Sequence, residues 1–237
     1  MKNMKRIFVE QLCLEVTRRC NMGCGHCLRG DAQNMDVSHE IIDEIFRQVD
    51  GIGQVTFTGG EPSLNIGAIR YFFHCAERAG TTLGSFFVAT NGKCNQEALA
   101  VELLKQYPKM EERELCGVAL SVDEWHDPQE YDSSILKGLN FYSTVKEHEG
   151  YKLVPDGRAA RMHLETALAL RPADIAISDN TDADSETISV ELLYVSANGK
   201  VTGNCDMSYE RIDAEAAYTL GNLRLEIEKV FAKTMGK

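Results

Sequence analysis

The chain has 237 residues and a formal net charge of −11 at pH 7, and hydrophobic residues make up 43% of it. The acidic balance argues against a general nucleic-acid-binding protein, which needs a basic face, and the apolar content suffices for a core without disulfides. No apolar run approaches the length of a membrane span, and the start lacks the apolar region and cleavage site of a signal peptide, so we expect a cytoplasmic protein without a membrane partner.

Short apolar runs alternate with longer amphipathic segments over the first two thirds of the chain. The apolar runs predict strands at 11–17, 53–60, 83–92 and 115–123. The amphipathic segments predict helices at 38–50, 65–79, 95–107 and 129–148, with Ser38 and Asn95 as capping residues. Helices long enough for crossovers between strands indicate an α/β fold with a parallel sheet.

The last third is less regular. Residues 151–155 predict a short strand, and residues 159–170 fit either a helix or a strand. An acidic, turn-rich loop is expected over 174–188. Two strands within 189–204 are joined at Asn198-Gly199, which is a strong hairpin signal, and an amphipathic helix follows at 222–234.

Eight cysteines are present, and three of them, Cys20, Cys24 and Cys27, lie within the stretch "CNMGCGHC". Such a tight cluster in a cytosolic chain more often binds metal than forms disulfides. An iron–sulfur cluster with three thiolate ligands would leave one iron open to another ligand. Structural zinc would need a fourth protein ligand, for which His26 and Cys205 are the candidates.

Other candidate motifs also stand at the ends of predicted strands. "TFTGGEP" ends the second strand, "ATNG" the third, and "SVDEWHD" the fourth. The carboxyl ends of parallel strands meet at one rim, so these segments and the cysteines are expected to build a single site. Glycines let backbone approach a ligand closely, and Glu61 can accept hydrogen bonds from an ammonium group.

The cysteine spacing C-x3-C-x2-C, with His26 at a usually aromatic position and "GGEP" one strand later, resembles the radical S-adenosylmethionine (radical SAM) superfamily. The resemblance implies a partial (β/α)6 TIM-like barrel with a short C-terminal extension. It implies that Cys20, Cys24 and Cys27 hold a [4Fe–4S] cluster whose fourth iron takes the amino and carboxylate groups of S-adenosyl-L-methionine. It also implies that the cofactor is bound by Gly59, Gly60, Glu61, Pro62, Thr90, Asn91, Ser121 and Asp123.

The resemblance also suggests a division of the chain. The partial barrel would span 8–195, with its sixth strand at 189–195. Residues 196–237 are similar to a truncated SPASM- or twitch-like extension of peptide-modifying members, packed on the barrel, but only Cys205 is available there for an auxiliary cluster. Candidate catalytic or substrate residues are His126, Arg158, Arg161 and Cys205, with packing or a surface position as the competing interpretation for each.

Members of this family cleave S-adenosylmethionine reductively to a 5′-deoxyadenosyl radical, which abstracts hydrogen from a substrate. The resemblance therefore implies an enzyme that acts on a peptide or protein and receives electrons from a donor such as ferredoxin or flavodoxin. The alternatives within the family are a glycyl-radical-enzyme activase and an enzyme that modifies a small molecule or nucleotide. An alternative of another class is a non-catalytic zinc-binding module.

Overall fold

The computed structural model describes residues 5–122, 126, 134–146, 153–162 and 169–236. Their strands form one eight-stranded sheet in the order β5-β4-β3-β2-β1-β6-β7-β8. The pairs from β5 through β1 to β6 are parallel, and β7 and β8 continue the sheet in antiparallel pairs. The strands are β1 (Arg6–Thr17), β2 (Gly51–Gly59), β3 (Thr82–Thr90), β4 (Gly117–Val122), β5 (Tyr142–Lys146), β6 (Thr187–Val195), β7 (Lys200–Thr202) and β8 (Tyr218–Thr219).

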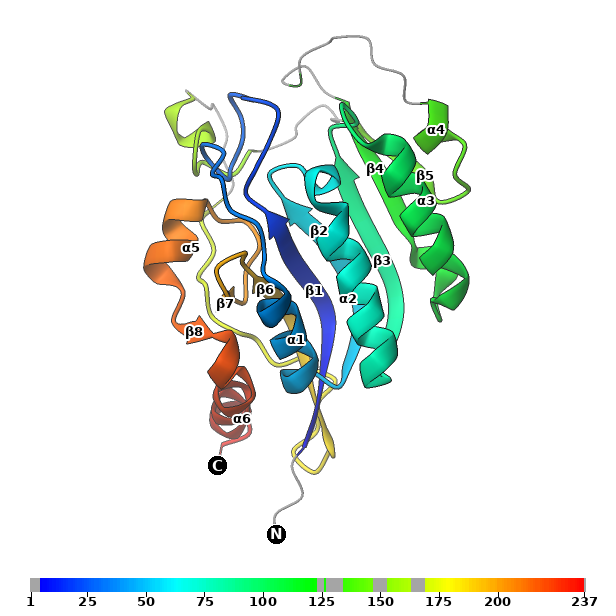
Figure 1. Ribbon diagram of the computed structural model, residues 1–237. Helices are drawn as coiled ribbons and strands as arrows, with labels where there is room; N and C mark the ends of the chain where they lie inside the picture. The colour runs from blue at the N-terminus through cyan, green and yellow to red at the C-terminus, as the bar shows by residue number, and fades with distance from the viewer. Residues whose placement is uncertain (1–4, 123–125, 127–133, 147–152, 163–168, 237) are drawn as a thin grey trace.

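Helices α1, α2 and α3 lie side by side on one face of this sheet (Figure 1). Helix α5 lies next to the loop that follows β1, and α6 packs against β6. The side chains of Ser38 and Ser208 cap α1 and α5 by accepting hydrogen bonds from backbone N–H groups. The helices are α1 (His39–Gln48), α2 (Ile66–Ala79), α3 (Gln96–Gln106), α4 (Ser134–Lys137), α5 (Tyr209–Glu215) and α6 (Leu223–Thr234).

The main hydrophobic core fills the space between the sheet and the helix layer. Buried aromatic rings join its layers: Phe57 on β2 makes edge-to-face contacts with Phe72 and Phe73 on α2, and Phe73 meets Phe86 on β3. A smaller cluster of Cys13, Tyr194, Met207 and Ile212 joins β1 and β6 to the C-terminal segment. The sheet is therefore fixed against its helices by burial and against the C-terminal segment by a second, separate set of contacts.

The predicted fold class is confirmed, because a mostly parallel sheet with crossover helices forms an open, partial TIM-like barrel. The sixth parallel strand, β6, contains the segment 189–195 that the sequence predicts for it. It pairs with β1 rather than with β5. The first strand consequently has parallel neighbours on both sides, β2 and β6. The loop that leaves β1 at its carboxyl end is thus placed near the middle of the sheet rather than at an edge.

The helix predicted over 129–148 is wrong within the described residues. Only Ser134–Lys137 is helical there, and Tyr142–Lys146 forms β5. The turn around Gly138 ends the helix, and the run Tyr-Ser-Thr-Val that follows consists of residues suited to a pleated strand. Asn95 precedes α3 as predicted, but it has φ of 51° and makes no side-chain cap; its amide donates to Ser63 O instead.

The last third follows the prediction in most places. Residues 174–186 form the predicted loop, with a single bridge from Ile177 to β6, whereas residues 187–188 belong to β6. The hairpin turns at Asn198-Gly199, where Gly199 has φ of 79°. The predicted final helix is α6, whereas α5 was not predicted. The strand predicted over 151–155 is wrong within its described residues, because 153–155 belong to no strand of the sheet, and Ala159–Arg161 of the ambiguous segment forms a short 3-10 helix. Residues 151–152 and 163–168 lie outside the described residues. Among the residues described, no helix is long and apolar enough to cross a membrane.

Candidate active site

The carboxyl ends of β1, β2, β3 and β4 border one cavity of about 470 Å³. The cysteine loop, residues 18–30, forms one wall, and the ends of β2, β3 and β4 contribute residues 58–62, 89–91 and Ser121. Residues of the 153–158 segment and of the C-terminal segment before and in α5 complete the lining. The convergence of four strand ends on one site, expected from the sequence, is therefore what the structure shows.

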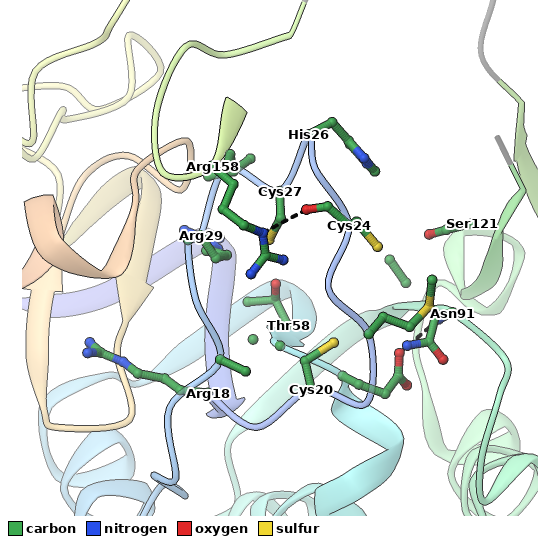
Figure 2. A pocket seen from close by; sticks show the side chains of 18 of the residues that line it. Arg18, Cys20, Cys24, His26, Cys27, Arg29, Thr58, Asn91, Ser121 and Arg158 are labelled. Atoms are coloured by element: carbon green, nitrogen blue, oxygen red, sulfur yellow. Dashed lines mark hydrogen bonds between the residues drawn. The ribbon is translucent and has the colours of Figure 1, made fainter. Parts of the chain in front are cut away.

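Cys20, Cys24 and Cys27 are carried by this one loop and lie around the same hollow (Figure 2). None of the three cysteines forms a disulfide, and all three are half-buried. Among the described residues no three His, Cys, Asp or Glu side chains are grouped tightly enough for a single metal ion. Burial raises the pKa of Cys20, and the charges of Glu61, Cys24 and Cys27 add to this effect.

This donor set fits a [4Fe–4S] cluster. The candidate ligands are three soft thiolates on a loop that borders a cavity, and no other cysteine of the described residues lines that cavity. Three ligands for four irons leave one iron to a ligand that the protein does not supply. Metal binding must displace the thiol protons and therefore depends on pH, and burial of Cys20 raises its pKa and makes the loss of its proton harder.

Gly59 and Gly60 are required by the approach of the cysteine loop to the end of β2. A Cβ added at Gly59 would meet Thr17 O at 1.9 Å, and one at Gly60 would meet Arg19 O at 2.2 Å. At this crossing Gly60 N donates to Thr17 O and Glu61 N donates to Arg19 O, each at 2.8 Å. Two backbone hydrogen bonds therefore fasten the base of the cysteine loop to the "GGEP" segment, and side chains on the glycines would separate them.

Glu61 joins the "GGEP" segment to the "ATNG" segment. Its carboxylate, in a residue 1% exposed, accepts hydrogen bonds from Ser63 N at 3.0 Å, Thr90 Oγ1 at 2.6 Å and Asn91 N at 2.8 Å. The Asn91 amide in turn donates to Asn21 in the cysteine loop at 2.8 Å. Glu61, which the sequence predicts to contact a ligand, thus holds the ends of β2 and β3 together. Asn91 connects these two strand ends to the cysteine loop.

The "PDGR" segment supports the cysteine loop from the opposite side. Arg158 Nε donates to Cys24 O at 2.7 Å, drawn as a dashed line in Figure 2, and Arg158 N donates to Cys27 O at 2.9 Å. Gly157 has φ of 55°, and a Cβ there would meet Leu28 O at 2.3 Å. Arg158 therefore positions the loop, with Asp31 as its ion-pair partner at 3.1 Å.

Asp156 connects the same segment to α5. Its carboxylate accepts hydrogen bonds from Gly157 N and Ser208 N, each at 2.8 Å, and from Arg211 Nη1 at 3.2 Å. Burial raises the pKa of this carboxyl, but the hydrogen bonds from Ser208, Gly157 and Arg211 outweigh that effect and lower it. The negative form of Asp156 is thus part of the folded structure.

A third support comes from Arg18, which directly precedes the cysteine-bearing part of the loop. Its buried guanidinium bonds Glu15 at 2.6 Å and both carboxylate oxygens of Asp213 in α5, at 2.8 and 2.9 Å. Its Cζ lies 4.6 Å from the ring centroid of Tyr209. The loop also contacts the C-terminal segment through Arg29, whose Nη1 donates to Met207 O at 2.7 Å.

The remaining predicted site residues fall in different places. Pro62, Ser121 and His126 line the cavity, and the ring of His126 meets that of His26 edge to face at 5.1 Å between centroids. Asp123 lies outside the described residues. Arg161 is exposed and does not line the cavity, and Cys205 lines a separate cavity of about 740 Å³.

Sequence reasoning missed Arg18, Arg29, Thr58, Asp206 and Tyr209 as lining residues. The two arginines flank the cysteine cluster, so their position beside it was a usable signal. Thr58 precedes the glycine pair on the same strand. The only local sequence signal for Tyr209 is the capping residue Ser208 directly before it. Its place in the site depends on contact with the cysteine loop, which is distant in sequence.

Comparison with known proteins places the chain in a family. A family model described as the radical SAM superfamily matches residues 14–146, which is more than half of the chain. An uncharacterized protein of Methanocaldococcus jannaschii, MJ0907, is 28% identical over 100 residues, which is 40% of this chain and 35% of that protein. The matched segment thus spans about a third of the length of this curated relative.

Solved structures resemble the fold over nearly the whole chain. BtrN in complex with AdoMet and 2-DOIA superposes with a TM-score of 0.56 at 15% identity, covering 98% of this chain and 87% of that chain. SuiB of Streptococcus suis bound to its precursor peptide SuiA gives a TM-score of 0.40 at 13% identity, covering 92% and 65%. At 15% identity the likeness to BtrN concerns the fold alone.

We predict that Glu61→Gln destabilises the protein by about 1–3 kcal/mol, because the new amide places a donor among three donors and leaves a buried hydrogen bond unmade. Urea unfolding of the purified protein measures the change. Glu97→Gln, at an exposed position on α3, is the matched control and is expected to have little effect. Equal stabilities for the two variants would contradict the joining role of Glu61.

We also predict that Asp156→Asn removes a pH-dependent part of the stability. The folded pKa of Asp156 lies below its unfolded value of about 3.9, so its stabilisation is complete above that pH and is lost as pH falls through the folded pKa. The difference in unfolding free energy between wild type and Asp156→Asn, about 1–3 kcal/mol at neutral pH, should therefore shrink in acid. A difference that stays constant with pH, or an equal loss in the exposed control Asp184→Asn, would argue against this role.

Proposed function

The chain belongs to the radical SAM superfamily, and we propose that its cavity holds a [4Fe–4S] cluster on Cys20, Cys24 and Cys27 with S-adenosylmethionine at the fourth iron. The observation that carries this proposal is the donor set. Three thiols of one loop line the cavity that the ends of β2, β3 and β4 also line, without a fourth cysteine among the lining residues. A zinc-binding module is the alternative of another class, and its closed shell would need His26, which also lines the cavity, as the fourth ligand.

When bound, the cluster supplies the electron that cleaves S-adenosylmethionine to methionine and a 5′-deoxyadenosyl radical, which takes a hydrogen atom from the substrate. The protein itself holds the thiols in place and encloses the reaction. Backbone bonds from Gly60 and Glu61 and the Arg158 side chain fix the loop from two sides. Such fastening keeps the sulfur positions defined while the cavity is open to a ligand.

The polar groups at the ends of β2, β3 and β4 are the proposed contacts for S-adenosylmethionine. Thr58, Asn91 and Ser121 border the cavity from three neighbouring strands. Glu61 already accepts three hydrogen bonds from the chain, so its contribution to cofactor binding is chiefly to hold Thr90 and Asn91 in place. Hydrogen bonds to the cofactor's amino and carboxylate groups would then come from preformed strand ends.

A peptide or protein is the substrate that the sequence resemblance favours. Electrons would come from a small donor such as ferredoxin or flavodoxin. A small-molecule substrate is the second candidate, and one observation supports it. BtrN, whose structure covers 98% of this chain, was solved in complex with AdoMet and 2-DOIA.

We predict that Cys24→Ala abolishes cluster binding and the reductive cleavage of S-adenosylmethionine. Wild type reconstituted without oxygen should bind about four irons per chain and form 5′-deoxyadenosine under dithionite. Iron analysis and chromatography of the product measure both. Cys205→Ala is the matched control, because Cys205 lines a different cavity, and it should retain the iron. Stoichiometric zinc without iron in wild type, or full cleavage by Cys24→Ala, would refute the proposal.

The substrate class can be determined by deuterium transfer. We expect reconstituted enzyme to place deuterium in 5′-deoxyadenosine when it is incubated with an extract from cells grown in deuterated medium. The extract is divided into a macromolecular and a low-molecular-weight fraction, and part of each is digested with protease first. If protease digestion abolishes the transfer of deuterium to 5′-deoxyadenosine, the substrate is a peptide or protein. Transfer from the small fraction that survives digestion identifies a small molecule and excludes the peptide proposal.

A further inference from the structure

Tyr209, the first residue of α5, has a buried hydroxyl without a hydrogen-bond partner among the described residues. The residue is 2% exposed and lines the cavity that contains the three cysteines. Buried tyrosine hydroxyls usually have a partner, because an unmade hydrogen bond away from water is costly. The partner of this hydroxyl is therefore to be sought in what the cavity binds.

The ring of Tyr209 is held in a fixed position beside the cysteine loop. The guanidinium of Arg18 lies over it at 4.6 Å from the ring centroid, and that guanidinium is fixed in turn by Glu15 and Asp213. The backbone N–H of Tyr209 donates to Arg29 O in the loop at 3.1 Å. A tyrosine bound this way on both its ring and its backbone cannot turn its hydroxyl outward without disturbing the loop.

The groups around the hydroxyl leave few acceptors. Both carboxylate oxygens of Glu15 are engaged: one accepts from Arg18 and from Ala197 N, the other from the Tyr194 hydroxyl. The guanidinium groups of Arg18 and Arg29 are donors only. Cys27 comes two residues before Arg29, whose carbonyl accepts a hydrogen bond from Tyr209 N at 3.1 Å, and both Tyr209 and Cys27 line the cavity.

We propose that the Tyr209 hydroxyl donates a hydrogen bond to the Cys27 thiolate when that sulfur binds iron, and that this bond makes the cluster easier to reduce. The inference rests on the proposed function. A hydrogen bond to a ligating sulfur offsets part of the negative charge that reduction adds, so it shifts the reduction potential upward. Tyr209 acts through Cys27 and is a positioning and tuning residue rather than a catalytic one.

The test compares Tyr209→Phe with wild type in the full-length, anaerobically reconstituted protein. The measurement is the midpoint potential of the cluster, from a redox titration followed by the EPR signal of the reduced form. We expect a more negative potential in Tyr209→Phe with the iron content unchanged. Tyr142→Phe is the matched control, since the Tyr142 hydroxyl on β5 is also buried without a partner but lies away from the cavity. Its potential should equal that of wild type.

A second variant strengthens the same bond instead of removing it. Difluorotyrosine placed at position 209 keeps the ring but is a better hydrogen-bond donor, so the midpoint potential should move in the positive direction. Four irons per chain in Tyr209→Phe with a potential equal to that of Tyr142→Phe would overturn this inference and leave the proposed function intact. Wild type that binds no iron would instead overturn the proposed function itself, and the inference with it.

Discussion

The buried guanidinium of Arg18 is the contact on which the site depends. It is enclosed between Glu15 at the end of β1 and Asp213 in α5, and its side chain has no exposed surface. Loss of one partner from a buried ion pair costs about 3–5 kcal/mol, because a charge is then left without compensation. Burial disfavours the charged form of Arg18, yet the hydrogen bonds to Asp213 and Glu15 outweigh it and raise the pKa, so this arginine stays charged.

The cysteine loop is held by neighbours from distant parts of the chain rather than by its own sequence. Backbone bonds at Gly60 and Glu61 fix its first residues, and Arg158 fixes the carbonyls of Cys24 and Cys27. The loop has little regular structure of its own and contains glycines at 23, 25 and 30. Its shape is therefore set by packing and hydrogen bonding from three sides, which suits a loop that must present thiols into an open cavity.

The sequence was sufficient for the elements that depend on local patterns. Alternating apolar runs predicted β1 to β4, and the glycine turn at Gly199 predicted the β6–β7 hairpin. It failed where short segments carry conflicting signals, as at β5. The partners of the cysteine loop could not be predicted either, because Arg18 and Asp213 are 195 residues apart and no periodicity relates them. Motif spacing identified the three cysteines as site residues. Only the fold shows that Arg158 holds the cysteine loop and that Glu61 joins the "GGEP" segment to the "ATNG" segment.

The pairing of β6 with β1 has a consequence for the order in which the molecule can be completed. Strand β1 can pair with its second parallel neighbour only after Thr187–Val195 has been synthesised. Asp213, the partner of Arg18 in the cysteine loop, is synthesised later still. A growing chain thus displays three thiols on a loop that lacks its C-terminal partner for most of its synthesis. Contacts of such long sequence separation form late, because closing the intervening chain costs entropy first. Assembly of the site is therefore one of the last events in folding, although its cysteines are among the first residues made.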